Sequence, residues 1–292
     1  MIIDVHTHTP THAGPVPAEL AGGSDWGQGS VRTARSWAEY DADLVGVDAS
    51  IAFTIAVPDP LHDTGLVGDP TRINDATIDF VRNDPGRRIG FGSVNPTVPG
   101  WQEELERCVA AGLQGIKIGA NYQRFDPLGE QARELYAFAE RRSLPMMFHQ
   151  GASPITGAPL RYSHPLTTDE IAIAHPELRI VMAHLAHPYT REAVTVIRKH
   201  PHVYADVSAL VSRPWTLYEG LLFAHEWGSG HKLLFGSDYP IITPEQSMTA
   251  LRSVNDVVAG TRMPRIPEEM VEGIIHADAL AALGLDLSIG AP

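Results

Sequence analysis

The chain begins with an apolar run that ends in two histidines, in the sequence IIDVHTH. Side chains two residues apart in a β-strand point to the same side, so His6 and His8 are predicted to project together from the end of a strand at residues 2–6. Neutral imidazole is a common ligand of transition metals. The pair therefore suggests one part of a metal site, and the other ligands must come from distant segments.

Three further polar residues end apolar runs: His149 in PMMFH, His184 in RIVMAH and Asp238 in LLFGSD. The interval from His149 to His184 is one strand–helix unit of about 35 residues, and the interval from His6 to His149 is four such units. Two shorter units separate His184 from Asp238. This common period places the residues at the ends of strands one, five, six and eight. Several histidines and one carboxylate around a common centre suit a divalent transition metal.

The elements that must position these residues are short apolar runs alternating with helical patterns. Several runs are almost wholly apolar, as in parallel sheets buried on both faces. Eight such units in 292 residues predict an α/β protein, a distorted (β/α)8 TIM barrel; a doubly wound open sheet is the alternative. We expect a single domain over residues 1–292, with helices at about 243–283 packed on the barrel. The predicted strands are residues 2–6, 49–57, 88–95, 113–119, 145–151, 178–185, 202–208 and 232–238.

Two long connections are rich in Gly, Pro and Asp, at residues 9–35 and 58–71. Connections of this length in compact domains are usually lids or binding loops. In a barrel, the carboxyl ends of all strands open on one face, where active sites of this fold lie. The two loops are therefore predicted to border the proposed metal site.

The composition limits the partners. A net charge of −13 argues against nucleic acid and anionic membrane surfaces. The single cysteine, Cys108, excludes an internal disulfide and fits a reducing compartment. We find no signal peptide and no apolar run long enough to span a bilayer. A cytoplasmic protein acting on a small molecule is expected, and a homo-oligomer is left open.

The segments IIDVHTH, GIKIG, LPMMFHQG, LRIVMAHLAHP, HVYADVS and LLFGSDYP resemble the amidohydrolase superfamily. Within it they are similar to the branch of amidohydrolase-related (amidohydrolase 2) and aminocarboxymuconate-semialdehyde decarboxylase-like enzymes, over essentially the whole chain. The resemblance implies a mononuclear metal centre. It implies that His6, His8 and His149 are ligands, Asp238 a ligand or proton-transfer group, and His184 a general acid/base or ligand. The metal is expected to be Zn, with Mn, Fe or Co as alternatives.

Lys117, in GIKIG, ends the fourth strand on the same face. In binuclear members of the superfamily a lysine there is carboxylated and bridges two metals. Here an ordinary ammonium that binds substrate or pairs with a carboxylate is favoured over that bridge. Close relatives often carry a histidine two residues after this lysine, whereas this chain has Gly119. Asp4 shares a face with His6, and either a supporting role behind the site or packing within the strand accounts for it.

Arginines in the loops after active-face strands suit the bidentate capture of a carboxylate, and in an acidic chain they hint at an anionic substrate. A loop histidine and nearby aromatic residues could line the same site. The predicted substrate-binding residues are Lys117, Arg124, Arg161, His187, Arg213, Trp215 and Tyr239.

The leading functional hypothesis is a metal-dependent hydrolase of a small, anionic amide, ester or lactone. Asp238 would take a proton from metal-activated water, and His184 would pass one to the leaving group. The alternative is a metal-dependent, non-oxidative decarboxylase of an aromatic or unsaturated carboxylic acid. A barrel that binds a metal or small molecule without turnover is the third possibility. The ligand set alone does not separate hydrolysis from decarboxylation.

Overall fold

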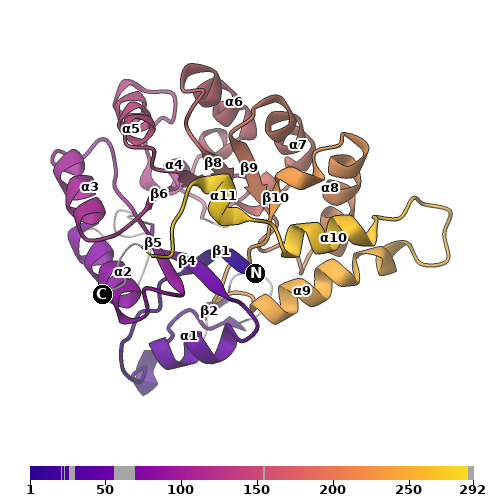
Figure 1. Cartoon of the computed structure of the whole chain (residues 1–292), viewed down its shortest axis with the longest axis horizontal. Helices are drawn as coiled ribbons and strands as arrows, with labels where there is room; N and C mark the ends of the chain where they lie inside the picture. The colour runs from indigo at the N-terminus through magenta and orange to yellow at the C-terminus, as the bar shows by residue number, and fades with distance from the viewer. Residues whose placement is uncertain (21, 23, 26–29, 56–69, 154, 289–292) are drawn as a thin grey trace.

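Eight parallel strands form one sheet that closes into a barrel in the computed structural model (Figure 1), which describes residues 1–20, 22, 24–25, 30–55, 70–153 and 155–288. The strands of this sheet pair in the order β1, β4, β5, β6, β7, β8, β9 and β10, which is their order in the chain. The last segment returns to β1: the amide of Val5 donates to the Phe235 carbonyl at 3.0 Å, and the amide of Asp238 donates to the His6 carbonyl at 2.9 Å. The predicted TIM barrel is confirmed, and the open doubly wound sheet is excluded. The barrel strands are β1 (Ile3–His8), β4 (Ala49–Phe53), β5 (Arg88–Gly92), β6 (Gly115–Ile118), β7 (Met146–Phe148), β8 (Ile180–Met182), β9 (Val203–Asp206) and β10 (Leu233–Leu234).

Each predicted strand overlaps one observed strand, and most observed strands are shorter. The helices surround the barrel (Figure 1). In the amphipathic helix over residues 190–199, Ala193, Val194 and Ile197 are fully buried, as expected for a helix packed on a sheet. The helices are α1 (Trp37–Asp43), α2 (Pro70–Asn83), α3 (Trp101–Ala110), α4 (Ala120–Gln123), α5 (Glu130–Arg141), α6 (Pro165–Ala174), α7 (Thr190–Lys199), α8 (Pro214–Glu226), α9 (Pro244–Arg252), α10 (Glu268–Ile275) and α11 (Ala279–Leu283). Short 3-10 helices are η1 (Ala18–Leu20), η2 (Leu160–Ser163), η3 (Ala183–Ala186), η4 (Gly230–Lys232) and η5 (Val254–Val258).

The first long connection is not without structure. It contains η1 and a small antiparallel pair of strands, β2 (Ser24–Asp25) and β3 (Ser30–Val31). The predicted loop at 58–71 lies outside the described residues up to position 69, and its last two residues belong to α2. Among the described residues, no helix is both long and apolar enough to cross a lipid bilayer.

The amino end of the barrel is covered by α11, which lies across the strands in Figure 1. Ala279 and Leu283 of this helix pack in one apolar cluster with Ile3 and Ala49, the first residues of β1 and β4. Burial of this surface from water stabilises the closed end. A substrate must therefore reach the barrel interior from the carboxyl ends of the strands.

Candidate metal centre

The fold brings the predicted ligands together at the carboxyl ends of β1, β7, β8 and β10. The Nε2 atoms of His6 and His8 lie 3.3 and 3.1 Å from the same oxygen, Oδ1 of Asp238. The ring of His184 is centred 4.7 Å from that of His6 and 5.2 Å from that of His149. Residues up to 232 positions apart in the chain, from His6 to Asp238, thus meet in one cluster.

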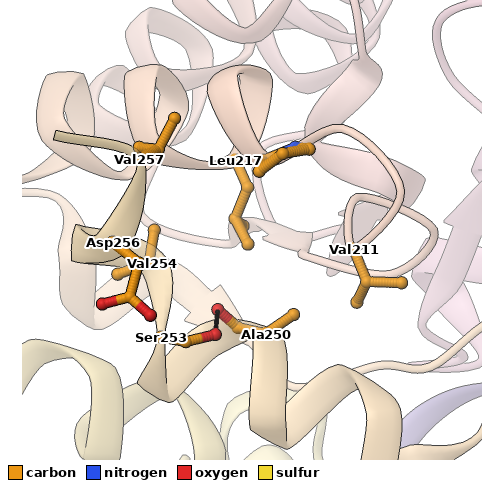
Figure 2. Close-up of a pocket in the computed structure, with 8 residues that line it drawn as sticks. Val211, Leu217, Ala250, Ser253, Val254, Asp256 and Val257 are labelled. Carbon is orange, nitrogen blue, oxygen red and sulfur yellow. Dashed lines mark hydrogen bonds between the residues drawn. The ribbon is translucent and has the colours of Figure 1, made fainter. Parts of the chain in front are cut away.

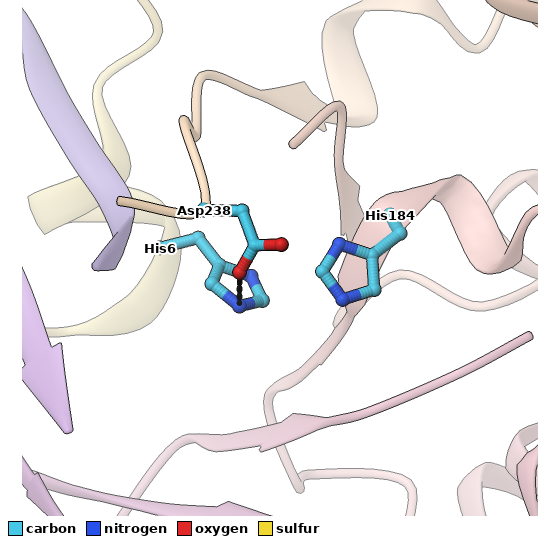
Figure 3. Close-up of side chains that lie close together, drawn as sticks. All are labelled: His6, His184 and Asp238. Atoms are coloured by element: carbon cyan, nitrogen blue, oxygen red, sulfur yellow. Dashed lines mark ion pairs between the residues drawn. The ribbon is translucent and has the colours of Figure 1, made fainter. Parts of the chain in front are cut away.

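His6, His184 and Asp238 form the tightest group, with one donor atom from each within 4.8 Å of the others (Figure 3). Two ligand atoms held at about 2.1 Å from one tetrahedral ion are about 3.4 Å apart. The distances from Asp238 Oδ1 to the two Nε2 atoms of His6 and His8 are close to this value. The donor set therefore fits a divalent metal ion.

His8 and His149 differ from this group in their surroundings. His8 is one-third exposed, on the open side of the cluster. His149 is buried, and its Nε2 lies 3.2 Å from the Ala152 carbonyl oxygen. If Nε2 carries the proton in that hydrogen bond, Nδ1 is the nitrogen of His149 that remains for a metal.

Burial keeps the imidazoles neutral, as metal ligation requires. It lowers the pKa of His6 and His184 well below the usual range, and nearby positive groups add to this effect. Burial, together with the charge of Lys117, also lowers the pKa of His149 to about 3. These histidines are available as neutral ligands at physiological pH.

Lys117 is fully buried inside the barrel, on β6. Its Nζ lies 3.4 Å from His6 Nε2 and 4.3 Å from the centre of the Phe53 ring. Burial lowers the pKa of Lys117 to about 8, against the opposing effect of Asp206 and Asp238. A buried positive charge therefore stands beside the histidines at neutral pH.

Two carboxylates support the cluster from behind. Asp206, at the end of β9, lies 2.8 Å from His6 Nδ1 and was not singled out from the sequence. Asp206 ends the apolar run of the strand that follows His184, and this position could have identified it as a candidate site residue. Asp4 accepts the backbone amides of His6 and Ser237 at 3.1 and 3.0 Å and so holds β1 against the last segment. Burial raises the pKa of Asp4 to about 7.

The backbone is strained at two of the site residues. His184, Leu185 and Ala186 have φ angles of +60°, +45° and +49°, and Asp238 has φ of +69°. Non-glycine residues in this left-handed region cost on the order of 1–2 kcal/mol each and gather at functional sites. The three consecutive residues with positive φ turn the chain sharply after β8.

The other predicted substrate contacts lie in the segments that follow β6, β7, β8 and β9. Arg213 donates to the Ala209 carbonyl at 2.8 Å, and burial together with its charge lowers the pKa of His187, which places these two residues near each other. Arg124 directly follows α4, Arg161 lies over the neighbouring Tyr162 ring, and Trp215 is half exposed at the start of α8. Their roles in substrate binding stay predictions.

Tyr239 does not fit its predicted role. Its side chain is fully buried, its ring packs against Tyr40 at 5.1 Å, and its hydroxyl donates to Asp43 at 2.9 Å. Asp238 belongs to the cluster of metal-type donors, whereas the ring of the next residue, Tyr239, packs in the core beside Tyr40 of α1. Its ring is part of the packing under α1 and is not available to line a substrate site.

Tyr122, which sequence reasoning missed, lies against the site instead. Its ring is centred 4.5 Å from that of His149, and its hydroxyl hydrogen-bonds with Ser153. A Cβ atom at Gly119 would lie 2.9 Å from the Tyr122 ring. The absence of a side chain at Gly119 therefore leaves room for this aromatic ring.

A separate, mostly apolar cavity of about 300 Å³ lies between α8, α9 and η5 (Figure 2). Its lining contains none of the predicted ligands or substrate-binding residues. It is lined by Val211, Pro214, Leu217, Ala250, Ser253, Val254, Asp256 and Val257.

The family model for amidohydrolases matches residues 3–285. The chain belongs to the amidohydrolase family. No curated protein matches this chain. Its fold is similar to several solved structures, all distant in sequence.

One similar structure is a probable 2-pyrone-4,6-dicarboxylic acid hydrolase from Acinetobacter baumannii, with 14% identity, a TM-score of 0.65 and coverage of 97% of this chain and 99% of that one. Another is 2,6-dihydroxybenzoate decarboxylase with its substrate, at 16% identity, a TM-score of 0.64 and coverage of 97% and 99%. A third is a dihydroxybenzoic acid decarboxylase from Polaromonas sp. JS666 with bound manganese, at 16% identity, a TM-score of 0.62 and coverage of 97% and 96%. At these identities the comparisons show only the fold that this chain shares with the three proteins.

Proposed function

We propose that this amidohydrolase-family protein is a metal-dependent decarboxylase of a small aromatic or unsaturated carboxylic acid. The observation that carries a carboxylate substrate is the buried ammonium of Lys117, 3.4 Å from a histidine of a metal-type donor set. A buried charge is costly unless it is paired, and a substrate carboxylate would pair it. Several of the similar structures are decarboxylases of hydroxybenzoates. This similarity favours decarboxylation over hydrolysis, which was the leading hypothesis from the sequence.

The ion would be held by His6, His184 and Asp238, with His8 and His149 beside them. When bound, a divalent ion supplies a Lewis acid that orients the oxygen atoms of the substrate and stabilises negative charge. The similar decarboxylase with manganese makes Mn a candidate equal to the expected Zn.

The chain's own groups supply the remaining steps. In decarboxylation the bond between the substrate carbon and its carboxylate breaks, carbon dioxide leaves, and a proton is delivered to that carbon. Asp238 directs one oxygen, Oδ1, towards the Nε2 atoms of His6 and His8, so its other oxygen can hold and deliver this proton (Figure 3). Lys117 orients the carboxylate, and the ring of Phe53, 5.0 and 5.3 Å from His6 and His8, forms an apolar wall that excludes water.

The second candidate is hydrolysis of a small anionic lactone, ester or amide. The likeness to a probable 2-pyrone-4,6-dicarboxylic acid hydrolase favours it, and its substrate would also satisfy Lys117. The two reactions differ in the fate of the atoms. Decarboxylation releases carbon dioxide, whereas hydrolysis adds an oxygen atom of water to the product.

The test uses the full chain loaded with Mn²⁺ or Zn²⁺ and three probes: carboxyl-¹³C 2,6-dihydroxybenzoate, carboxyl-¹³C 5-carboxyvanillate and 2-pyrone-4,6-dicarboxylate, each in ¹⁸O-labelled water. We expect ¹³C-labelled carbon dioxide from an aromatic acid, and its loss in Asp238→Asn. Incorporation of ¹⁸O into an opened lactone, without release of carbon dioxide, would establish hydrolysis instead.

A further inference from the structure

A single buried carboxylate connects two histidines of the site. Asp206 Oδ2 lies 2.8 Å from His6 Nδ1. Its other oxygen, Oδ1, accepts the backbone amides of His184 at 2.9 Å and of Ser208 at 3.0 Å, and also the Ser208 hydroxyl. Asp206 and Ser208 are both fully buried. The contacts therefore act without competition from bulk water.

The hydrogen bonds determine where the protons lie. A carboxylate accepts hydrogen bonds and does not donate them, so the hydroxyl of Ser208 uses its single proton on Asp206. Ser208 Oγ can then only accept from His184 Nδ1, which lies 2.8 Å away. A neutral imidazole carries one proton, so the lone pair of His184 is on Nε2.

The same reasoning applies to His6. Its Nδ1 donates to Asp206, which leaves the lone pair on Nε2. That lone pair faces the carboxylate oxygen of Asp238 at 3.3 Å. Two acceptors at this distance repel each other unless a positive charge is close to them, and Lys117 Nζ, 3.4 Å from His6 Nε2, or a bound cation would supply that charge.

The backbone of His184 depends on the same carboxylate. His184 is the first of three consecutive residues with positive φ, and its amide donates to Asp206 Oδ1. Asp206 thus holds the backbone of His184 directly and its ring through Ser208. A displacement of Asp206 would move both rings at once.

We propose that Asp206 and Ser208 are positioning residues that fix the Nδ1–H tautomer of His6 and His184, leaving both Nε2 atoms free to bind one divalent cation. A hydrogen-bonded partner behind a ligating imidazole usually contributes about 10- to 100-fold in metal affinity. The inference rests on the proposed function for the role of the cation, but its test requires no turnover.

The first measurement is a two-bond ¹H–¹⁵N correlation spectrum of the metal-free, ¹⁵N-labelled chain, which reports the tautomer of each histidine. In the wild type we expect His6 and His184 as Nδ1–H. Ser208→Ala should release the tautomer of His184. It should leave that of His6, because His6 Nδ1 lies closer to Asp206 Oδ2, at 2.8 Å, than to the Ser208 hydroxyl, at 3.3 Å. Ser208→Thr, which keeps the hydroxyl, should show both tautomers of the wild type. Asp206→Asn should disturb both, because an amide group can donate where the carboxylate only accepts.

The second measurement is calorimetric titration with Mn²⁺ and with Zn²⁺. We expect 10- to 100-fold weaker binding in Asp206→Asn and in Ser208→Ala. The matched control is Ser229→Ala, because Ser229 is equally buried, and its hydroxyl donates to the Ala224 carbonyl away from the site. This control should bind metal as the wild type does.

Wild-type tautomers and wild-type metal affinity in Ser208→Ala would overturn the proposal. If Asp206→Asn fails to fold, the pair Ser208→Ala and Ser208→Thr still decides, because both keep the carboxylate. A chain that shows these tautomers and binds metal, yet releases no carbon dioxide, would refute the proposed function and leave this inference standing.

Discussion

Replacement of Lys117 by methionine tests the assignment of a buried ammonium to the site. Methionine keeps the length and the apolar stem and removes the charge. Burial lowers the pKa of Lys117 from 10.5 to about 8. Since one pKa unit corresponds to about 1.4 kcal/mol, the charged form costs the folded, metal-free chain at most about 3.5 kcal/mol.

The pH dependence follows from the direction of this change. Between pH 8 and 10.5 the unfolded chain binds more protons at this lysine than the folded chain does. The free energy of unfolding of the wild type therefore rises with pH across this window. Lys117→Met should be more stable than the wild type at pH 7, by at most about 3.5 kcal/mol or about 6 °C in Tm, and this advantage should vanish near pH 10.5.

Substrate binding should be weakened by Lys117→Met, whereas stability is raised. Loss of a charge-assisted contact costs about 1.5–3 kcal/mol, so KM for a carboxylate substrate should rise about 10- to 150-fold. Urea denaturation of the chelator-treated chain at pH 7 and pH 10, with kinetics of the metal-loaded chain, measures both effects.

Lys232→Met is the matched control. Burial also lowers the pKa of Lys232 to about 8, but this side chain donates to the Pro201 carbonyl and lies 4.1 Å from the Tyr204 ring, at the amino end of β10. Its replacement should leave KM unchanged. Lower stability of Lys117→Met than of the wild type at pH 7, together with an unchanged KM, would refute the reasoning.

The other predictions concern the metal, the aromatic contact and the cysteine. Mass spectrometry of chain purified without chelator should find about one divalent ion per chain, and His6→Ala should lose it; two ions would instead favour a carboxylated lysine bridge. Gly119→Ala should displace the Tyr122 ring from His149, lower stability by about 1–3 kcal/mol and change KM, whereas an unchanged KM would place Tyr122 outside the substrate site. Cys108 is buried and its pKa is raised to about 12 by burial, so iodoacetamide should modify it at pH 8 only after unfolding; rapid reaction of the folded chain would contradict this.

The sequence predicted the barrel and most of the residues of the candidate site that lie at its strand ends, with Asp206 as the exception. In a strand–helix repeat, a polar residue at the carboxyl end of each apolar run must face the same end of the barrel. His6, His149, His184 and Asp238 could therefore be grouped from their spacing alone. The bounds of the strands were less accurate, because the pattern of apolar residues continues beyond the last hydrogen-bonded pair.

Only the tertiary structure decided which neighbours of these residues take part. Asp206 ends its apolar run as Asp238 does. Its contacts with His6 and Ser208 depend on the angle between strands, and the spacing of residues in the sequence does not determine this angle. Tyr239 and Tyr122 show the same limit, since the first turns into the core and the second reaches the site through the space left at Gly119. Repeat spacing determines which end of the barrel a residue occupies, whereas side-chain contacts depend on distances of a few ångströms between segments remote in the chain.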